Sequence, residues 1–216
     1  MIQIKTFYFN DLRTCCYLLW DQTNEAILID PGCATQSERE RLKKFIVHER
    51  LTPRFVVNTH AHFDHVMGNA FVCAQWEIKT CIHPAEIEML EQASYYSRMF
   101  NLDMEQPPVD TIPLSEQTPI RFGESQLQVI ETPGHTPGGI SLIASHERFL
   151  ISGDTLFAGS IGRTDLPGGD FDQLMTSITQ KIFPLGSPLR ILPGHGPETT
   201  LSYEMSHNPF LVPFPR

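Results

Sequence analysis

The sequence lacks any long hydrophobic run. In its 216 residues no apolar stretch approaches the about 20 residues that span a bilayer, and the opening MIQIKTFYFN has no basic segment before an apolar one. Positive charge is also scarce, since 16 Lys and Arg stand against 25 Asp and Glu, for a formal net charge of −9. Surfaces that bind nucleic acid or anionic membranes need an excess of Lys and Arg. We therefore expect a cytoplasmic protein that binds neither nucleic acid nor a membrane.

Cysteine is sparse and shows no pairing motif. The five cysteines are Cys15, Cys16, Cys33, Cys73 and Cys81, and none forms a C-x-x-C pair. Most lie in or beside apolar stretches, which predicts small buried hydrophobes in a reducing compartment. The G-x-S-x-G motif of serine hydrolases is absent as well, so nothing indicates a covalent serine route.

Short apolar runs separated by turn residues predict a chain rich in strands. The first three expected strands are Ile2–Phe9, Thr14–Trp20 and Ala26–Asp30. Helices are expected after two capping patterns, Thr35–Glu38 and Asp170–Gln173. We expect the second to open the last helix, which carries the apolar residues Leu174, Ile178 and Ile182. Residues 93–110 fit no period and are predicted to be a long surface excursion.

No repeat, low-complexity tract or charged linker interrupts this pattern. A single domain over residues 1–216 is therefore expected, of the α/β class, with sheets packed together and helices outside.

Metal-ligand side chains are concentrated in one short segment. Four of the six residues from 60 to 65 are His or Asp, and they follow the apolar run Phe55–Val57. If the segment stays extended, His60 and His62 point to the same side and could hold one ion. Asp64 and His65 follow in a predicted turn and helix start, where a second ion could be reached. This density favours a metal site over a solvated polar loop.

Three further positions repeat one local pattern, in which an apolar strand is followed by Gly or Pro-Gly and then a ligand-type residue. They are His135, Asp154 and His195. Each alone fits an ordinary turn residue. Strand ends that share one sheet edge are where α/β proteins place ligands. Together with residues 60–65 they supply five histidines and two aspartates, enough for two neighbouring ions with Asp154 shared.

The order of these residues resembles the metallo-β-lactamase superfamily from about residue 2 to the end of the chain. The H-x-H-x-D-H loop corresponds to residues 60–65, and the single His, Asp and His follow in family order. The resemblance implies a four-layer αββα sandwich with the metal site at one edge. It implies one metal held by His60, His62 and His135, another held by Asp64, His65 and His195, and Asp154 as the bridge.

Within that superfamily, residues 132–138 and 153–157 resemble the glyoxalase II branch. Residues 159–169 resemble its short bacterial glyoxalase II-like (hydroxyacylglutathione hydrolase-like) members. We therefore expect a thioester hydrolase with a small-molecule thioester as substrate. A metal-bound hydroxide would attack the carbonyl, with Asp64 and Asp154 as the catalytic carboxylates. Two divalent ions are expected, zinc first and iron or manganese as alternatives. The C-terminal helical domain with which full-length glyoxalase II enzymes bind glutathione is not expected here.

Several alternatives stay open at this point. Persulfide dioxygenases of the same superfamily share the loop and a G-R-T-D segment like residues 162–165, and hold one iron through the counterparts of His60, His135 and Asp154. Another ester or lactone hydrolase, or a metal-binding protein without catalysis, also fits. Arg163 either pairs with Asp165 or binds a substrate carboxylate. The sequence does not indicate an oligomeric state.

Overall fold

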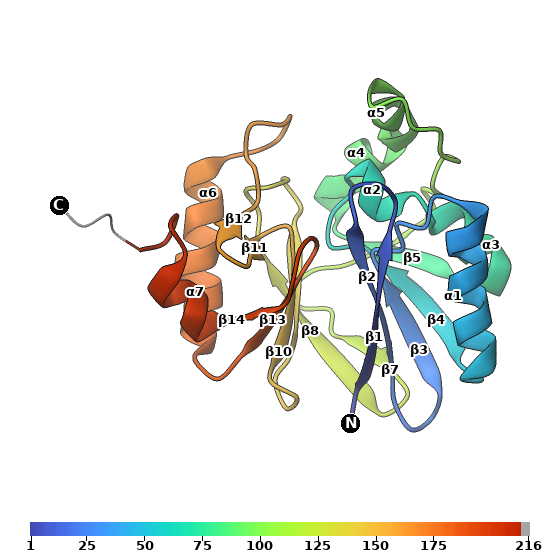
Figure 1. Cartoon of the computed structure of the whole chain (residues 1–216), viewed down its shortest axis with the longest axis horizontal. Coiled ribbons are helices and arrows are strands. Elements are labelled where there is room, and N and C mark those ends of the chain that lie inside the picture. Colours follow the sequence, from blue (N-terminus) through green and yellow to red (C-terminus); the bar gives the residue numbers. More distant parts are fainter. Residues whose placement is uncertain (213–216) are drawn as a thin grey trace. The chain divides into compact units, whose positions relative to one another are not determined.

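A computed structural model describes residues 1–212 of the chain (Figure 1). The last four positions of the expected domain, 213–216, lie outside the described residues. The chain forms two compact units, the first made of residues 1–114 and 120–126 and the second of residues 115–119 and 127 onward. Strands and helices occur in both units, which confirms the mixed α/β class, while the single domain over residues 1–216 stays a prediction.

The first unit contains a six-stranded sheet in the order β1-β2-β3-β4-β5-β6. Its strands are β1 (Gln3–Phe9), β2 (Thr14–Trp20), β3 (Glu25–Ile29), β4 (Thr52–Val57), β5 (Lys79–Ile82) and β6 (Ile112–Pro113). The first three pair antiparallel, and β3 to β6 are parallel neighbours. The three predicted N-terminal strands are thus confirmed to within a residue at their ends. Because parallel strands end at the same edge, the segments after β3, β4 and β5 leave the sheet side by side.

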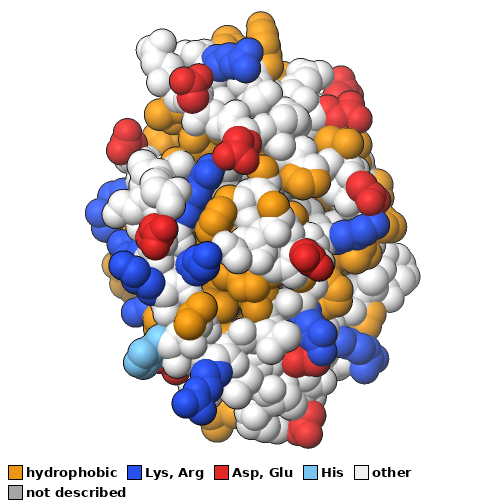
Figure 2. Space-filling view, turned by 90° about the vertical axis from the view of Figure 1, so that its right-hand side faces the viewer, with side chains coloured by type: hydrophobic (Ala, Val, Ile, Leu, Met, Phe, Trp, Pro, Cys, Tyr) orange, Lys and Arg blue, Asp and Glu red, His pale blue; other side chains and the backbone are white. Residues whose placement is uncertain are grey.

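Six helical segments belong to the first unit. They are α1 (Gln36–His48), α2 (Phe63–Val66), α3 (Asn69–Trp76), the 3-10 turn η1 (Pro84–Glu86), α4 (Ile87–Glu91) and α5 (Ala93–Met99). The predicted capping box of α1 is confirmed: Thr35 Oγ1 accepts from the N–H of Glu38 at 3.3 Å, and Glu38 Oε2 accepts from the N–H of Thr35 at 2.9 Å. Leu42 and Ile46 of this helix pack into a core that includes Phe7 of the sheet. On the face drawn in Figure 2, Lys and Arg side chains are interspersed with Asp and Glu.

The prediction for residues 93–110 was wrong in part. Ala93–Met99 forms α5, and the loop lies beyond it. Only Ala93 and Ser97, four positions apart, are buried, whereas Tyr95 and Met99 are more than three-fifths exposed. The buried stripe is therefore too narrow, and too poor in large apolar side chains, to give a helical period that could be recognised.

The second sheet has the order β14-β13-β10-β9-β8-β7. Its strands are β7 (Ile120–Phe122), β8 (Ser125–Glu131), β9 (Ile140–Ala144), β10 (Phe149–Gly153), β13 (Arg190–Pro193) and β14 (Thr199–Thr200), and β11 (Leu156–Phe157) pairs with β12 (Ser160–Ile161) as a separate ribbon. Strands β10 and β13 are parallel, so their carboxyl ends lie at one edge. Asp154 follows the first and His195 lies two residues beyond the second.

The helices of the second unit begin with α6 (Phe171–Thr176). Asp170 Oδ1 accepts from the N–H of Gln173 at 2.9 Å, and the segment continues through η2 (Ser177–Ile182) and η3 (Phe183–Leu185). The predicted buried side chains, Leu174, Ile178 and Ile182, are confirmed. The expectation that this helix is the last was wrong, because β14 and α7 (Leu201–His207) follow. Within residues 1–212, no helix combines the length and apolar character that crossing a bilayer requires.

Candidate metal centre

The seven predicted metal ligands lie in both units of the chain. The first ligand group, His60, His62, Asp64 and His65, belongs to the first unit, and the second ligand group, His135, Asp154 and His195, belongs to the second. Each follows the carboxyl end of a strand.

The first ligand group brings three imidazole rings together after β4. The ring centroids of His60 and His62 are 4.8 Å apart, and those of His60 and His65 are 4.1 Å apart. Strand β4 ends at Val57, so these residues lie beyond it, and α2 begins directly after His62. The predicted helix start therefore exists, and it turns Asp64 and His65 into the same cluster, with Asp64 Oδ2 3.5 Å from His65 Nε2.

A buried carboxylate that the sequence analysis missed supports this group. Asp30 Oδ2 accepts from Thr59 Oγ1 at 2.6 Å and lies 2.9 Å from His65 Nδ1, while Asp30 Oδ1 accepts from the N–H of Thr59 at 2.8 Å. A carboxylate at Nδ1 holds the proton there and orients the ring, an arrangement typical of metal-binding histidines. Asp30 directly follows β3 and precedes Pro31-Gly32, so the available signal in the sequence was a ligand-type residue at the end of an apolar strand.

A second missed carboxylate lies behind the same loop. The N–H of Ala61 donates to Glu86 Oε2 at 2.7 Å, and Glu86 is fully buried. Ala61 stands between His60 and His62, so this hydrogen bond fixes the backbone from which both imidazoles project. No motif surrounds Glu86 in the sequence, because it acts through a main-chain group from a distant turn.

In the second ligand group, one carboxylate oxygen lies between two imidazoles. Asp154 Oδ2 is 3.4 Å from His135 Nε2 and 3.6 Å from His195 Nε2. This is the placement that a bridging carboxylate needs. His135 Nδ1 donates to the main-chain oxygen of Arg163 at 2.7 Å, which sets the orientation of the His135 ring.

The donor set fits a cation. A carbonyl oxygen can only accept, so a neutral His135 carries its proton on Nδ1 and presents the lone pair of Nε2 toward Asp154. His65 stands in the same relation, with Asp30 at Nδ1 and Asp64 facing Nε2. Two acceptors at this distance repel each other unless a proton or a metal ion lies between them. Imidazole with carboxylate is the ligand set that zinc, iron and manganese accept.

The loop after β12 depends on a glycine. A Cβ added at Gly162 would collide with the main-chain oxygen of Asp154 and lie 3.2 Å from the Cβ of His135. Only glycine therefore allows the loop to pass so close to these two predicted ligands.

Arg163, the predicted substrate-binding residue, forms an ion pair with Asp165, which was the other possibility left open by the sequence. Its Nε and Nη2 donate to Asp165 Oδ1 and Oδ2 at 2.7 and 2.8 Å, with both side chains more than half exposed. The hydrogen bond with Arg163 lowers the pKa of Asp165 to about 2, and the same bond raises the pKa of Arg163. The structure shows a different contribution to the site, the carbonyl that orients His135, while the substrate contact stays a prediction.

Comparison with known proteins decides the family. A family model described as the metallo-beta-lactamase superfamily matches residues 10–195. The chain belongs to this superfamily. All seven predicted ligands fall within the matched range, and the predicted metallo-β-lactamase fold is confirmed. The chain is thus a metallo-hydrolase of this superfamily.

Three similar proteins carry different descriptions. "Hydroxyacylglutathione hydrolase GloC" of Haemophilus influenzae is 34% identical over 91% of this chain and 92% of its own. The structure titled "BLEG-1 B3 metallo-beta-lactamase" is 37% identical with a TM-score of 0.88, covering 98% of this chain and 100% of that one. The structure titled "TTHA1623 in a di-iron-bound form" is 35% identical with a TM-score of 0.87, covering 96% and 100%. Superfamily membership therefore does not select one substrate or one metal.

Proposed function

We propose that this protein is a glyoxalase II-like thioesterase that hydrolyses hydroxyacylglutathione-type thioesters. The reaction takes place at a centre of two divalent metal ions, for which zinc is the expected metal. The main support for the proposal is one arrangement found in both ligand groups. His65 and His135 each make a hydrogen bond through Nδ1 and present Nε2 toward a carboxylate. The 34% identity to a hydroxyacylglutathione hydrolase over nearly the whole chain supports the substrate class.

In this proposal the two ligand groups act together. His60, His62 and His135 would hold one ion and Asp64, His65 and His195 the other, with Asp154 shared. The bound ions would supply an activated water at neutral pH and polarise the thioester carbonyl. The protein's part is to hold each imidazole with its proton on Nδ1 and its Nε2 available to the ion, which Asp30 does at His65 and the Arg163 carbonyl does at His135.

The partners and setting that we propose follow from the charge and the cysteines. A net charge of −9 disfavours nucleic acid and anionic membranes, and a small-molecule thioester remains as the substrate. The five cysteines are all buried free thiols, in keeping with a cytoplasmic setting.

The test measures metal content and turnover on one sample. We expect two ions per chain and hydrolysis of S-lactoylglutathione, assayed beside a chromogenic β-lactam, a lactone, and glutathione persulfide with oxygen uptake. His135→Ala should abolish turnover and lower metal content. His48→Ala changes an exposed helical histidine outside both ligand groups, and should leave both quantities unchanged. Cleavage of the β-lactam or lactone without the thioester, or one iron with persulfide-dependent oxygen uptake, would overturn the proposal.

A further inference from the structure

We propose that Thr14 is a positioning residue for Asp64, an inference that rests on the proposed metal centre. Thr14 Oγ1 donates to Asp64 Oδ2 at 2.7 Å, and both residues are buried. Thr14 begins β2, 50 residues before Asp64 in the sequence, and belongs to no metal-binding motif. Sequence patterns alone therefore give no reason to connect the two.

The direction of this hydrogen bond follows from the count of protons. A threonine hydroxyl carries one proton, and two acceptors surround it: Asp64 Oδ2 at 2.7 Å and Asn10 Oδ1 at 3.3 Å. The shorter bond is to a carboxylate, and bonds to ionised acceptors are about twice as strong as those between neutral groups. The hydroxyl proton therefore goes to Asp64, and the Asn10 amide donates back to Thr14 Oγ1 at 3.2 Å.

The turn between β1 and β2 also holds the main chain of Asp64. Asn10 Nδ2 lies 3.0 Å from the main-chain oxygen of Asp64 and 3.1 Å from that of Gly32. A Cβ at Gly32 would collide with the same Asp64 oxygen, so the three segments can meet only with glycine at this position. Hydrogen bonds therefore hold the side chain of Asp64 through Thr14 and its backbone through Asn10.

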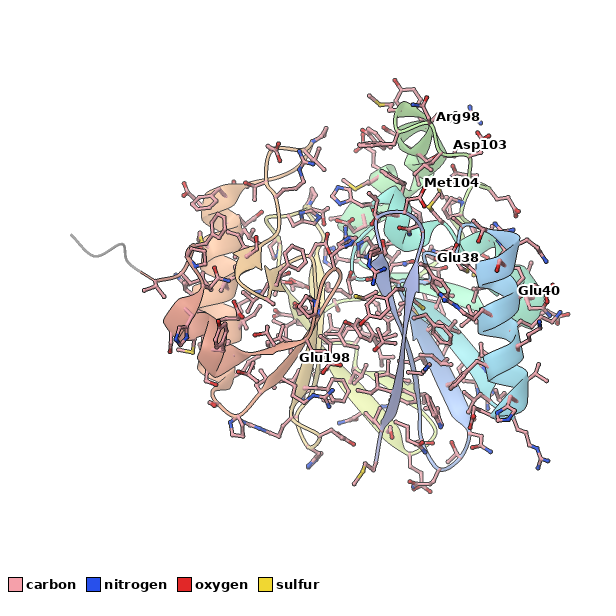
Figure 3. The ribbon with its side chains drawn as sticks, in the orientation of Figure 1. Glu38, Glu40, Arg98, Asp103, Met104 and Glu198 are labelled. Atoms are coloured by element: carbon pink, nitrogen blue, oxygen red, sulfur yellow. The ribbon has the colours of Figure 1, made fainter. Side chains whose placement is uncertain are left out.

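A helix anchors this turn in place. Glu38, labelled in Figure 3, lies in the first turn of α1, and its Oε1 accepts from the N–H of Asn10 at 2.7 Å. Its Oε2 accepts from the N–H groups of Ala34 and Thr35 at 3.0 and 2.9 Å. The same carboxylate therefore caps the helix and fixes Asn10, whose φ of +50° is a conformation that asparagine tolerates well.

These contacts give Thr14 a defined task. A carboxylate binds a metal ion only when it is correctly rotated, and a buried hydroxyl that donates to one of its oxygens holds that rotation. Loss of such an outer partner costs about 10- to 100-fold in metal affinity. The structure assigns this role to Thr14 because its hydroxyl contacts the carboxylate itself, whereas the contact from Asn10 reaches the main-chain oxygen of Asp64.

The test compares Zn²⁺ affinities of the whole protein by competition with a chromophoric chelator. Thr14→Val keeps the shape and removes the hydroxyl, whereas Thr14→Ser keeps the hydroxyl. Thr80→Val is the matched control, a buried threonine on β5 whose hydroxyl contacts Asn69 and Cys73 and no predicted ligand. Thermal unfolding of the metal-free proteins measures the cost to the fold.

We expect Thr14→Val to bind one of the two ions about 10- to 100-fold more weakly, with Thr14→Ser and Thr80→Val close to the parent protein. Equal affinity in Thr14→Val, or a loss in Thr14→Ser as large as in Thr14→Val, would overturn the inference. Should Thr14→Val fail to fold, Thr14→Ala is compared in the same way. Absence of thioesterase activity would refute the proposed function while leaving this comparison of affinities intact.

Discussion

Replacing Asp30 by asparagine should weaken metal binding and also destabilise the fold. The carboxylate of Asp30 receives the Thr59 hydroxyl and the His65 Nδ1–H on one oxygen, and the Thr59 N–H on the other. An asparagine side chain has one oxygen and one amide group. In either orientation the amide would face a hydrogen-bond donor, so Asp30→Asn both removes contacts and places donors against each other.

Asp30→Asn should lower two quantities, the free energy of unfolding and the metal affinity. A hydrogen bond to a charged group contributes about 1.5–3 kcal/mol, so loss of the two bonds on one oxygen should lower the free energy of unfolding by about 3–6 kcal/mol. Loss of the carboxylate that orients His65 should lower metal affinity by about 10- to 100-fold, equivalent to about 1.4–2.7 kcal/mol. The loss of metal affinity is measured on folded protein only.

Asp21→Asn provides a matched control. Asp21 is also buried and accepts four hydrogen bonds, from the N–H and hydroxyl of Thr23, the N–H of Glu124 and the hydroxyl of Ser125. None of these groups belongs to a predicted ligand. Chemical unfolding should therefore show both variants destabilised, whereas chelator competition should show weaker Zn²⁺ binding in Asp30→Asn alone. Equal Zn²⁺ affinities in the two folded variants would refute our account of Asp30.

Three further outcomes are expected. Gly162→Ala should lower the melting temperature and the retained metal, because its Cβ collides with the Asp154 carbonyl. Gly186→Ala, with φ of +71° and open space around it, should lower the melting temperature through backbone strain and leave the retained metal unchanged; equal losses of metal would contradict this. Although burial acts to raise it, hydrogen bonds led by the Thr23 hydroxyl lower the pKa of Asp21 from 3.8 to about 2, so the unfolded chain binds the proton first as pH falls. Stability from Asp21 is present above pH 4 and lost toward pH 2, and acid titration of unfolding should show a smaller loss over this range in Asp21→Asn. Burial raises the pKa of Cys33 to about 12, and all five cysteines are buried, so a thiol reagent should label the protein only on unfolding; rapid labelling of native protein would contradict the burial.

The ligand residues could be predicted from the sequence because each one carries its own local signal. His135, Asp154 and His195 each follow an apolar run and a glycine, and strand ends of this kind are recognised without knowledge of the fold. The capping box at Thr35 and the buried face of Leu174 and Ile178 were predictable for the same reason, since neighbouring residues determine them.

The supporting residues could not be predicted in this way, because their partners are distant in the sequence. Thr14 meets Asp64 across 50 residues and Glu86 meets Ala61 across 25. Arg163 supports His135 through a main-chain oxygen, which leaves no trace in side-chain chemistry. Only the folded chain brings such pairs together.

The difference between ligand residues and supporting residues also concerns which metal and substrate a member of the superfamily uses. Proteins 34–37% identical to this chain carry the descriptions hydroxyacylglutathione hydrolase, B3 metallo-beta-lactamase and di-iron-bound form, and the two solved structures superpose with TM-scores of 0.87 and 0.88. A fold so closely shared does not by itself distinguish substrates or metals. Metal affinity and ligand basicity respond to the outer hydrogen-bond partners, which lie in Thr14, Asp30, Glu86 and the Arg163 carbonyl. We therefore expect substitution of these outer partners, with the seven ligands unchanged, to change which metal the protein binds most tightly while the chain keeps its fold.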